Sequence, residues 1–243
     1  MFLKFRKLFN LITNLDLVRC KGMHTDAQAM RVLLKRFRID CVIDVGANEG
    51  QFVARIREQG FKGSIFSFEP VTLAFNKLSD VMAKDKKWIG KKMAMGAAQG
   101  KAEINVSQHT SFSSILETTE FAKENWDSAR TVAKESIDVS TLDLQLLEGT
   151  FGSCKSVLLK IDTQGYDLEV MKGAGDLIKK CVVIYCEVSF RAVYLGSPSY
   201  DQVFEFFAEK GFFPAAIYPI TRTSDLALNE VDVFFVRRSE NKN

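Results

Sequence analysis

The chain has 243 residues, of which 47% are hydrophobic and 26% charged, and these values are typical of one large soluble α/β domain. Its formal net charge of +3 is small, and beyond the N-terminus Lys and Arg are scattered among Asp and Glu, which argues against a nucleic-acid-binding protein. A chain of this length buries enough apolar surface to fold without disulfides or a structural metal.

The cysteines do not form a metal-binding or redox motif. No two have C-x-x-C spacing and three lie inside apolar runs, so we expect buried thiols in a reducing compartment. The sequence also shows no signal peptide and no apolar stretch long enough to span a bilayer, which predicts a cytoplasmic protein. The cysteines are Cys20, Cys41, Cys154, Cys181 and Cys186.

Residues 1–40 predict a helical extension before the main domain. Residues 1–22 interleave apolar and basic side chains, as in a helix that rests on a membrane surface, although packing on the domain or on a partner chain is the interpretation we favour. Residues 25–38 have a helical apolar period, with Thr25 or Asp26 at the N-cap. Membrane contact and oligomerisation stay open.

From residue 41 onward, short apolar runs alternate with helical patterns. Residues 41–45 form a β-branched run typical of a strand that is buried on both faces of a parallel sheet. A glycine turn follows this strand. The next predicted elements are a helix at 51–59, a strand at 64–68, a helix at 72–83, a less clear strand near 88–94 and an added strand at 103–106.

The alternation resumes after a polar interruption. Residues 107–136 are rich in Ser and Thr and lack a firm period, so we expect an insertion that lies over the sheet as a cap. Alternating strands and helices without a linker predict one doubly wound α/β domain at 41–237, with a mostly parallel seven-stranded sheet. Its later elements are strands at 156–162 and 181–187, a helix at 200–210, strands at 214–218 and 231–237, and a charged tail at 238–243.

The turn after the first strand carries the first candidate site residues. It reads D-x-G-x-N-x-G from Asp44 to Gly50, with Gly46 suited to close approach of the backbone to a ligand and Asn48 between the two glycines. A dinucleotide site instead has G-x-G-x-x-G, which holds an anionic pyrophosphate at the helix N-terminus. Acids at this place repel pyrophosphate but suit the cationic ammonium and sulfonium of S-adenosylmethionine. The turn therefore favours S-adenosylmethionine over NAD.

Glu69, at the end of the second predicted strand, supports the same interpretation. A carboxylate at that strand end can accept hydrogen bonds from both hydroxyls of a ribose. An acid in this position often only caps the following helix, but the D-x-G-x-N-x-G turn upstream favours the ligand-binding role.

Several motifs, in their order and spacing, resemble those of the FkbM family of methyltransferases, a branch of the class I fold. The resemblance covers residues 40–237 and implies an S-adenosylmethionine-dependent O-methyltransferase with a Rossmann-like sheet. Two positions depart from the family, which usually has an acid where Gln164 stands and Glu where Asp167 stands. The motifs are VIDVGANEG at 42–50, FEP at 68–70, TLD at 141–143, LKIDTQGYD at 159–167, GA at 173–174 and the strand that ends in Glu187.

The strand at 156–162 supplies the candidates for the chemistry. The resemblance implies that Asp162 faces the methionine end of the cofactor, and Lys160 points to the same face of the strand. A structural ion pair and a role in orienting the acceptor hydroxyl both stay open for these residues. As general base, Asp162 competes with His109, whose residue type is the most common general base but which lies in the polar insertion, where exposed histidines are common.

The remaining candidates concern cofactor contacts and the acceptor. Ser111 and Ser114 resemble a serine cluster of the family that lies near the cofactor, which implies hydrogen bonds to adenine or to the carboxylate. Glu187, Arg191 and Tyr194 are the candidate acceptor contacts. The resemblance implies a hydroxyl acceptor on a sugar, polysaccharide or secondary metabolite, so we expect a small-molecule or glycan acceptor and no nucleic acid.

Other functions receive less support. An NAD(P)-dependent oxidoreductase predicts a G-x-G-x-x-G turn and a Tyr-x-x-x-Lys relay, and nucleic-acid methylation predicts an N/D-P-P-Y/F strand end; the sequence has none of these. A non-catalytic nucleotide-binding module would have to be tested by turnover. Bound Mg²⁺ would need clustered oxygen ligands, but the available acids lack tight spacing, so we predict no metal. These acids are Asp138, Asp143, Asp162 and Glu187.

Overall fold

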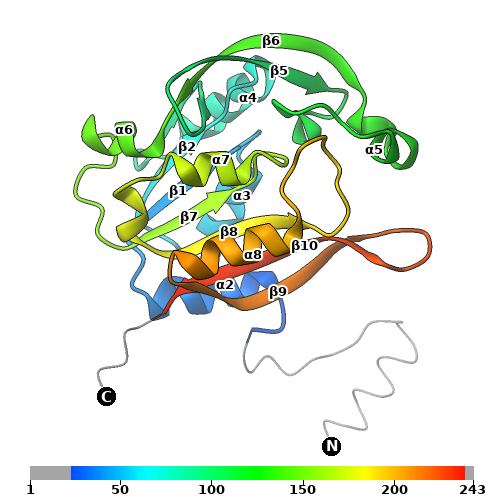
Figure 1. Ribbon diagram of the computed structural model, residues 1–243. Coiled ribbons are helices and arrows are strands. Elements are labelled where there is room, and N and C mark those ends of the chain that lie inside the picture. The colour runs from blue at the N-terminus through cyan, green and yellow to red at the C-terminus, as the bar shows by residue number, and fades with distance from the viewer. Residues whose placement is uncertain (1–22, 239–243) are drawn as a thin grey trace, which may run out of the picture.

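The computed structural model describes residues 23–238, and a seven-stranded sheet forms its centre (Figure 1). The strands are β1 (Cys41–Val45), β2 (Ser64–Phe68), β3 (Trp88–Lys91), β7 (Val157–Ile161), β8 (Cys181–Ser189), β9 (Phe212–Arg222) and β10 (Leu228–Arg237). Their order is β3-β2-β1-β7-β8-β10-β9, and all neighbours are parallel except β10, which is antiparallel to both β8 and β9. The predicted fold class, a doubly wound and mostly parallel sheet, is confirmed.

Helices cover both faces of this sheet. α2 (Asp26–Arg36), α3 (Gln51–Glu58) and α4 (Thr72–Met82) contribute to one apolar layer, whereas α6 (Leu142–Leu147), α7 (Asp167–Lys172) and α8 (Tyr200–Glu209) contribute to the other. In β1, Val42 packs into the first layer, and Ile43 and Val45 pack into the second. All residues of β1 are therefore buried, which explains the continuous apolar run in its sequence.

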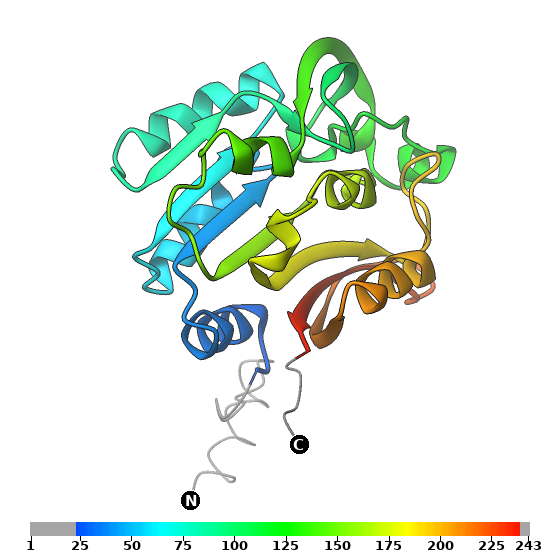
Figure 2. The same cartoon turned by 60° about the vertical axis from the view of Figure 1, so that its left-hand side comes forward.

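A second, three-stranded sheet lies beyond the carboxyl ends of the central strands. It consists of β4 (Ala94–Met95), β5 (Gly100–Ser107) and β6 (Thr131–Ser140) in the order β4-β6-β5. In Figure 2 the arrowheads of β1 and β7 point toward this part of the molecule. Ile104, Val106 and Ile137 of the small sheet pack on Val71 and Ala74 around the start of α4, which fixes the sheet beside the glycine turn.

The segment predicted as an insertion at 107–136 contains short helices and, in its second part, the start of a long strand. Residues 108–130, which we call the cap, hold the short helices η1 (Thr110–Phe112), α5 (Glu120–Asn125) and η2 (Asp127–Ala129), but β6 then begins and pairs with β5 along its length. The first residues of β6 are exposed, Val132 to 64%, so no buried face imposes an apolar alternation on them.

Other elements also differ from the sequence-based expectation. The strand expected near 88–94 is two strands of different sheets, β9 and β10 extend beyond the predicted bounds, and α6 and α7 were not predicted because six residues are too few to show a helical period. Residues 1–22 of the predicted helical extension and residues 239–243 of the tail predicted at 238–243 lie outside the described residues. Within 23–238, no helix combines the length and apolar character needed to cross a membrane. The four cysteines there are buried free thiols.

Two of the motifs that resemble the family, TLD at 141–143 and GA at 173–174, make contacts that stabilise the fold. Asp143 accepts hydrogen bonds from the backbone N–H groups of Asp176 (2.7 Å) and Leu177 (3.3 Å), and so stabilises the turn before β8. A Cβ atom at Gly173 would lie 2.0 Å from the carbonyl oxygen of Gly96, so only glycine allows this contact between α7 and the strand end of β4.

Candidate active site

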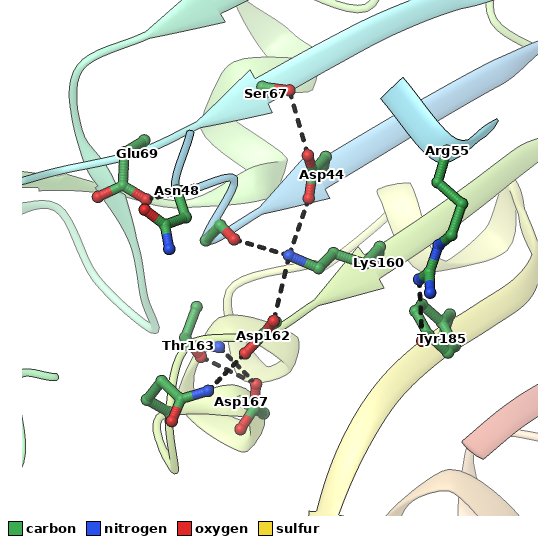
Figure 3. A network of polar contacts seen from close by, with 12 residues as sticks. Asp44, Asn48, Arg55, Ser67, Glu69, Lys160, Asp162, Thr163, Asp167 and Tyr185 are labelled. Atoms are coloured by element: carbon green, nitrogen blue, oxygen red, sulfur yellow. Dashed lines mark hydrogen bonds and ion pairs between the residues drawn. The ribbon is translucent and has the colours of Figure 1, made fainter. Parts of the chain in front are cut away.

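The carboxyl ends of β1, β2 and β7 meet at the glycine turn (Figure 3). Gly46 has φ +73°, and a Cβ atom there would lie 1.9 Å from the carbonyl oxygen of Asp162. The N–H groups of Gly46 and Ala47 both donate to the carbonyl oxygen of Phe68. The turn is thus held between the ends of its two neighbouring strands, at a distance that only a residue without a side chain permits.

Glu69 is 5% exposed and lies at the mouth of this turn. Its Oε2 accepts the backbone N–H of Asn48 at 2.7 Å, and its Oε1 accepts that of Val71 at 2.8 Å. Burial raises the pKa of Glu69 to about 7, although both backbone hydrogen bonds and Lys160 oppose this shift. Each oxygen keeps a second lone pair that can accept a hydrogen bond from a ligand.

Lys160 links Asp44 on β1 to Asp162 at the end of β7. Its ammonium donates to the carbonyl oxygen of Gly46 at 2.6 Å and forms ion pairs with Asp44 Oδ1 at 3.0 Å and Asp162 Oδ2 at 3.5 Å. Burial lowers the pKa of Lys160, but the carboxylates of Asp44 and Asp162 outweigh it and raise the pKa above its usual value. Lys160 therefore stays charged, with one hydrogen bond and two ion pairs, which favours the structural ion pair over a role in orienting an acceptor.

The acids of the turn itself lie away from any cavity. Asp44 is fully buried, takes a hydrogen bond from Ser67 at 3.4 Å and pairs with Lys160; burial raises its pKa although Lys160 opposes this. Glu49 pairs with Lys77 at 2.6 Å on the surface. We expected the carboxylates of the turn to face a cationic ligand, but Asp44 and Glu49 line neither of the two cavities described below. Their charge is balanced within the protein.

Gly50 has a packing role. It begins α3 with φ +91°, and a Cβ atom there would lie 2.7 Å from the ring of Trp88. Gly50 lets the helix start directly against β3 and does not line a cavity.

A first cavity extends from Glu69 to Asp162. Its middle is apolar and is walled by the strand ends and the small sheet. The cap closes one side, where Thr110 donates to Asn48 Oδ1 at 2.9 Å and Ser114 donates to the carbonyl oxygen of Gln164 at 2.7 Å. Among the described residues, the apolar part of the wall is formed by Val45, Phe68, Pro70, Val71, Ala94, Met95, Ile104, Ile115 and Tyr166.

A second cavity lies on the other side of Asp162 and shares Asn48, Ser111 and Asp162 with the first. Its wall is polar and acidic, in contrast to that of the first cavity. The other side chains of the wall include Gln51, Phe52, Arg55, Lys160, Tyr185, Glu187 and Asp232.

Three carboxylates stand side by side in the second cavity. Asp162 and Glu187 follow the paired residues Ile161 and Cys186, and Glu187 is the register partner of Asp232. Burial and the neighbouring acids raise the pKa of Glu187 well above its usual value, and burial raises that of Asp232 to about 6. The cations of the wall are already paired, Arg55 with Asp26 at 2.7 Å and Lys160 as described, so the cavity is electronegative.

The other predicted site residues, His109, Arg191 and Tyr194, line neither cavity. His109 is exposed, bonds Ser111 through Nδ1 at 2.7 Å and lines neither cavity. Arg191 is exposed over the ring of Phe121 and likewise lines neither. Tyr194 is 3% exposed, and its hydroxyl binds Gln164 beneath the cap.

The sequence-based reasoning missed Arg55, Tyr185, Asp232 and the central position of Gln164. Asp232 had a detectable signal, since it is a lone acid within the apolar run of the last strand. Within residues 23–238, no group of three or more His, Cys, Asp or Glu side chains has a geometry that could hold a metal ion. Asp138 instead pairs with Lys101 on β6, away from Asp162.

No curated protein matches the chain. Among solved structures, a methyltransferase FkbM from Methylobacillus flagellatus is 13% identical with a TM-score of 0.48, covering 81% of this chain; this chain spans only 43% of that one. An rRNA methylase from Streptococcus thermophilus is 9% identical with a TM-score of 0.49, covering 90% of this chain and 100% of the other.

A third structure, fibrillarin from Aeropyrum pernix with natively bound S-adenosyl-L-methionine, is 8% identical with a TM-score of 0.44, covering 81% of this chain and 66% of the other. The family model for the methyltransferase FkbM domain matches residues 44–214, which includes the glycine turn, both cavities' central strands and α8. Because this match spans well over half of the sequence, the chain belongs to the FkbM methyltransferase family.

Proposed function

We propose that the chain transfers the methyl group of S-adenosylmethionine to a hydroxyl oxygen of a small-molecule or glycan acceptor. The observation that carries this proposal is one apolar cavity with Glu69 at one end and Asp162 at the other, opening beside Asp162 into a second cavity. Membership of a methyltransferase family supports the reaction class.

The first cavity suits the parts of S-adenosylmethionine. Glu69 can accept hydrogen bonds from the two ribose hydroxyls, and its apolar neighbours suit the adenine ring. Asp162 at the far end is attractive to a cationic sulfonium and ammonium. A dinucleotide fits less well, because its pyrophosphate would meet the carboxylates of Glu69 and Asp162 in this cavity.

When bound, S-adenosylmethionine supplies a methyl group already activated by its positively charged sulfur. The protein then has to place the acceptor oxygen in line with the methyl carbon and to accept the hydroxyl proton. Asp162 lines both cavities, and its side chain is 39% exposed, so a proton from an acceptor in the second cavity can reach it. Lys160 holds this carboxylate and the glycine turn in place.

His109 is the less suitable base. It is exposed, hydrogen bonds Ser111 and lines neither cavity. Asp162 therefore takes the base role in our proposal, and His109 is the control position for substitutions that should not affect proton transfer.

The second cavity limits the acceptor. Above about pH 6, where Asp232 loses its proton, Asp162 and Asp232 on this wall repel a phosphate group, which supports a sugar or secondary-metabolite hydroxyl over a nucleic acid. Glu187 and Asp232 can accept hydrogen bonds from neighbouring hydroxyls of such an acceptor.

Calorimetric titration with S-adenosylmethionine and with NAD, on the wild type and on Glu69→Ala, tests the donor site. We expect the wild type to bind S-adenosylmethionine and the variant to bind it with at least tenfold lower affinity, because charge-assisted hydrogen bonds to the ribose are lost. Binding of NAD alone would contradict the proposal. Transfer of a tritiated methyl group to glycan and metabolite extracts then tests the acceptor class, with loss of transfer expected in Asp162→Asn and not in His109→Ala.

A further inference from the structure

Gln164 occupies an unusual place at the reacting end. It lies between β7 and α7 with φ +54°, a left-handed conformation that costs a non-glycine residue free energy. Its backbone carbonyl accepts the hydroxyl of Ser114 from the cap at 2.7 Å, which helps to hold this conformation. A strained residue that the surrounding structure fixes so firmly calls for a functional explanation.

The side chain of Gln164 bridges Asp162 and Tyr194. Its Nε2 donates to Asp162 Oδ1 at 2.7 Å, and its Oε1 accepts the hydroxyl of Tyr194 at 2.7 Å. The same hydroxyl lies 3.1 Å from the carbonyl oxygen of Phe112 in the cap, so it has a second acceptor within reach. A tyrosine hydroxyl has one hydrogen, and this arrangement therefore contains one more acceptor than Tyr194 can serve at a time.

In the ionised state of Asp162, the arrangement is satisfied as it stands. The amide N–H group points to the carboxylate, and the Tyr194 hydroxyl points to the amide oxygen. The other carboxylate oxygen lies 3.5 Å from the ammonium of Lys160. One oxygen of Asp162 thus faces the amide N–H group and the other faces the ammonium, an arrangement that an ionised carboxylate satisfies.

Once Asp162 has taken a proton, the requirement is reversed. The new O–H group needs an acceptor where the amide N–H now points. A half-turn of the amide puts Oε1 toward Asp162 and Nε2 toward the oxygen of Tyr194. The Tyr194 hydroxyl then turns to the carbonyl of Phe112, so each donor again has an acceptor without movement of the backbone.

We propose that Gln164 is a positioning residue that, with Tyr194, supports Asp162 in both of its protonation states by turning its amide. This inference rests on the proposed function, in which Asp162 takes the acceptor proton. Gln164 serves both states because an amide has a donor end and an acceptor end. A hydrophobic side chain in its place supports neither state, and an ionised carboxylate repels the charged one.

Other charged and titratable groups also lie around Asp162. Lys160 and Asp44 lie behind it, and Glu187 lies on the adjoining β8 with Asp232 on the next strand, β10. Asp167 begins α7, and Tyr194 contacts the cap. None of them donates a hydrogen bond to Asp162 Oδ1 within the described residues.

The full-length protein without ligand gives the direct test by nuclear magnetic resonance. The Gln164 side-chain amide and the Asp162 carboxyl carbon are followed from pH 3 to pH 9 with selective ¹⁵N and ¹³C labels. We expect both signals to change with one shared midpoint, and the amide transition to vanish in Asp162→Asn. An amide that stays unchanged while Asp162 titrates would overturn the inference.

A variant provides the second arm. In Gln164→Met the carboxylate loses its amide donor, so the midpoint of the Asp162 signal moves up by about one to two pH units. Gln108→Met, at an exposed glutamine of the cap, is the matched control and leaves the midpoint in place. An unchanged midpoint in Gln164→Met would contradict the inference. Calorimetry with S-adenosylmethionine on the same samples separates the two proposals. If the wild type does not bind S-adenosylmethionine, the proposed function fails, whereas the inference about Gln164 is decided by the titration alone.

Discussion

The buried pair of Lys160 and Asp44 leads us to predict an effect on unfolding stability that does not depend on any ligand. The ammonium and the carboxylate lie 3.0 Å apart, with their side chains 7% and 0% exposed. Lys160→Met keeps most of the side-chain volume and removes the charge. Asp44 is then left in the interior with Ser67 as its remaining hydrogen-bond donor among the described residues.

The magnitude follows from the distance and the burial. At 3.0 Å and an effective dielectric constant of about 20, the attraction is about 5.5 kcal/mol, which the variant loses. Removing one partner of a buried pair costs about 3–5 kcal/mol in unfolding free energy, because the other charge stays desolvated. Asp44 can escape part of this cost by binding a proton, since burial already raises its pKa.

Protonation makes the loss dependent on pH. In the variant the folded state keeps a proton on Asp44 that the unfolded state releases, so stability falls as pH rises between the two pKa values. The slope is at most about 1.4 kcal/mol per pH unit. We therefore expect Lys160→Met to be about 3–5 kcal/mol less stable than the wild type at pH 8 and to approach it toward pH 5.

Urea unfolding at pH 5, 6, 7 and 8 measures this difference. Adding Asp44→Asn to Lys160→Met removes the stranded charge, so the double variant recovers most of the stability at pH 8 and loses the pH slope. Lys155→Met, at an exposed lysine just before β7, is the control and shows neither effect. A deficit in Lys160→Met that is absent, or equal at all four pH values, would refute the reasoning.

Three further predictions concern the turn and the two cavities. The affinity for S-adenosylmethionine should fall as pH drops below about 7, where Glu69 takes a proton, and calorimetry should show a weaker affinity in Glu69→Gln without this pH dependence. Gly46→Ala should unfold in urea more readily than Gly149→Ala. Both glycines have positive φ, which costs an alanine about 1–3 kcal/mol at either position, but only at Gly46 would the new Cβ atom also collide with the backbone of Asp162. Glu187→Gln should be more stable than the wild type at pH 8, with the gain shrinking toward pH 5, because the raised pKa of Glu187 means that its ionised form is costly in the folded state; urea unfolding at both pH values checks this.

Much of the fold could be predicted because burial on two faces leaves a clear trace in the sequence. The apolar runs at 41–45, 64–68 and 181–187 each belong to a central strand that helices cover on both sides. The strand β6 left no such trace, since its first half is exposed and β5 alone pairs with it there. The short helices α6 and α7 were missed for a related reason, because each shows less than two turns of periodicity.

The candidate site was predictable in its positions but not in its partners. Strand ends are readable in the sequence, and Glu69 and Asp162 both line the first cavity. Which acids are neutralised depends on contacts between distant segments, such as Lys160 with Asp44 and Lys77 with Glu49. No local pattern encodes these pairs. For the same reason the bridge from Asp162 through Gln164 to the cap was not foreseeable.

The central claim is that Glu69 and Asp162 mark the two ends of a site for S-adenosylmethionine. A crystal structure with S-adenosylhomocysteine tests it most directly. We expect the ribose hydroxyls within hydrogen-bond distance of Glu69 and the sulfur directed past Asp162 toward the second cavity. An empty first cavity at saturating ligand, or a ribose bound away from Glu69, would contradict the account.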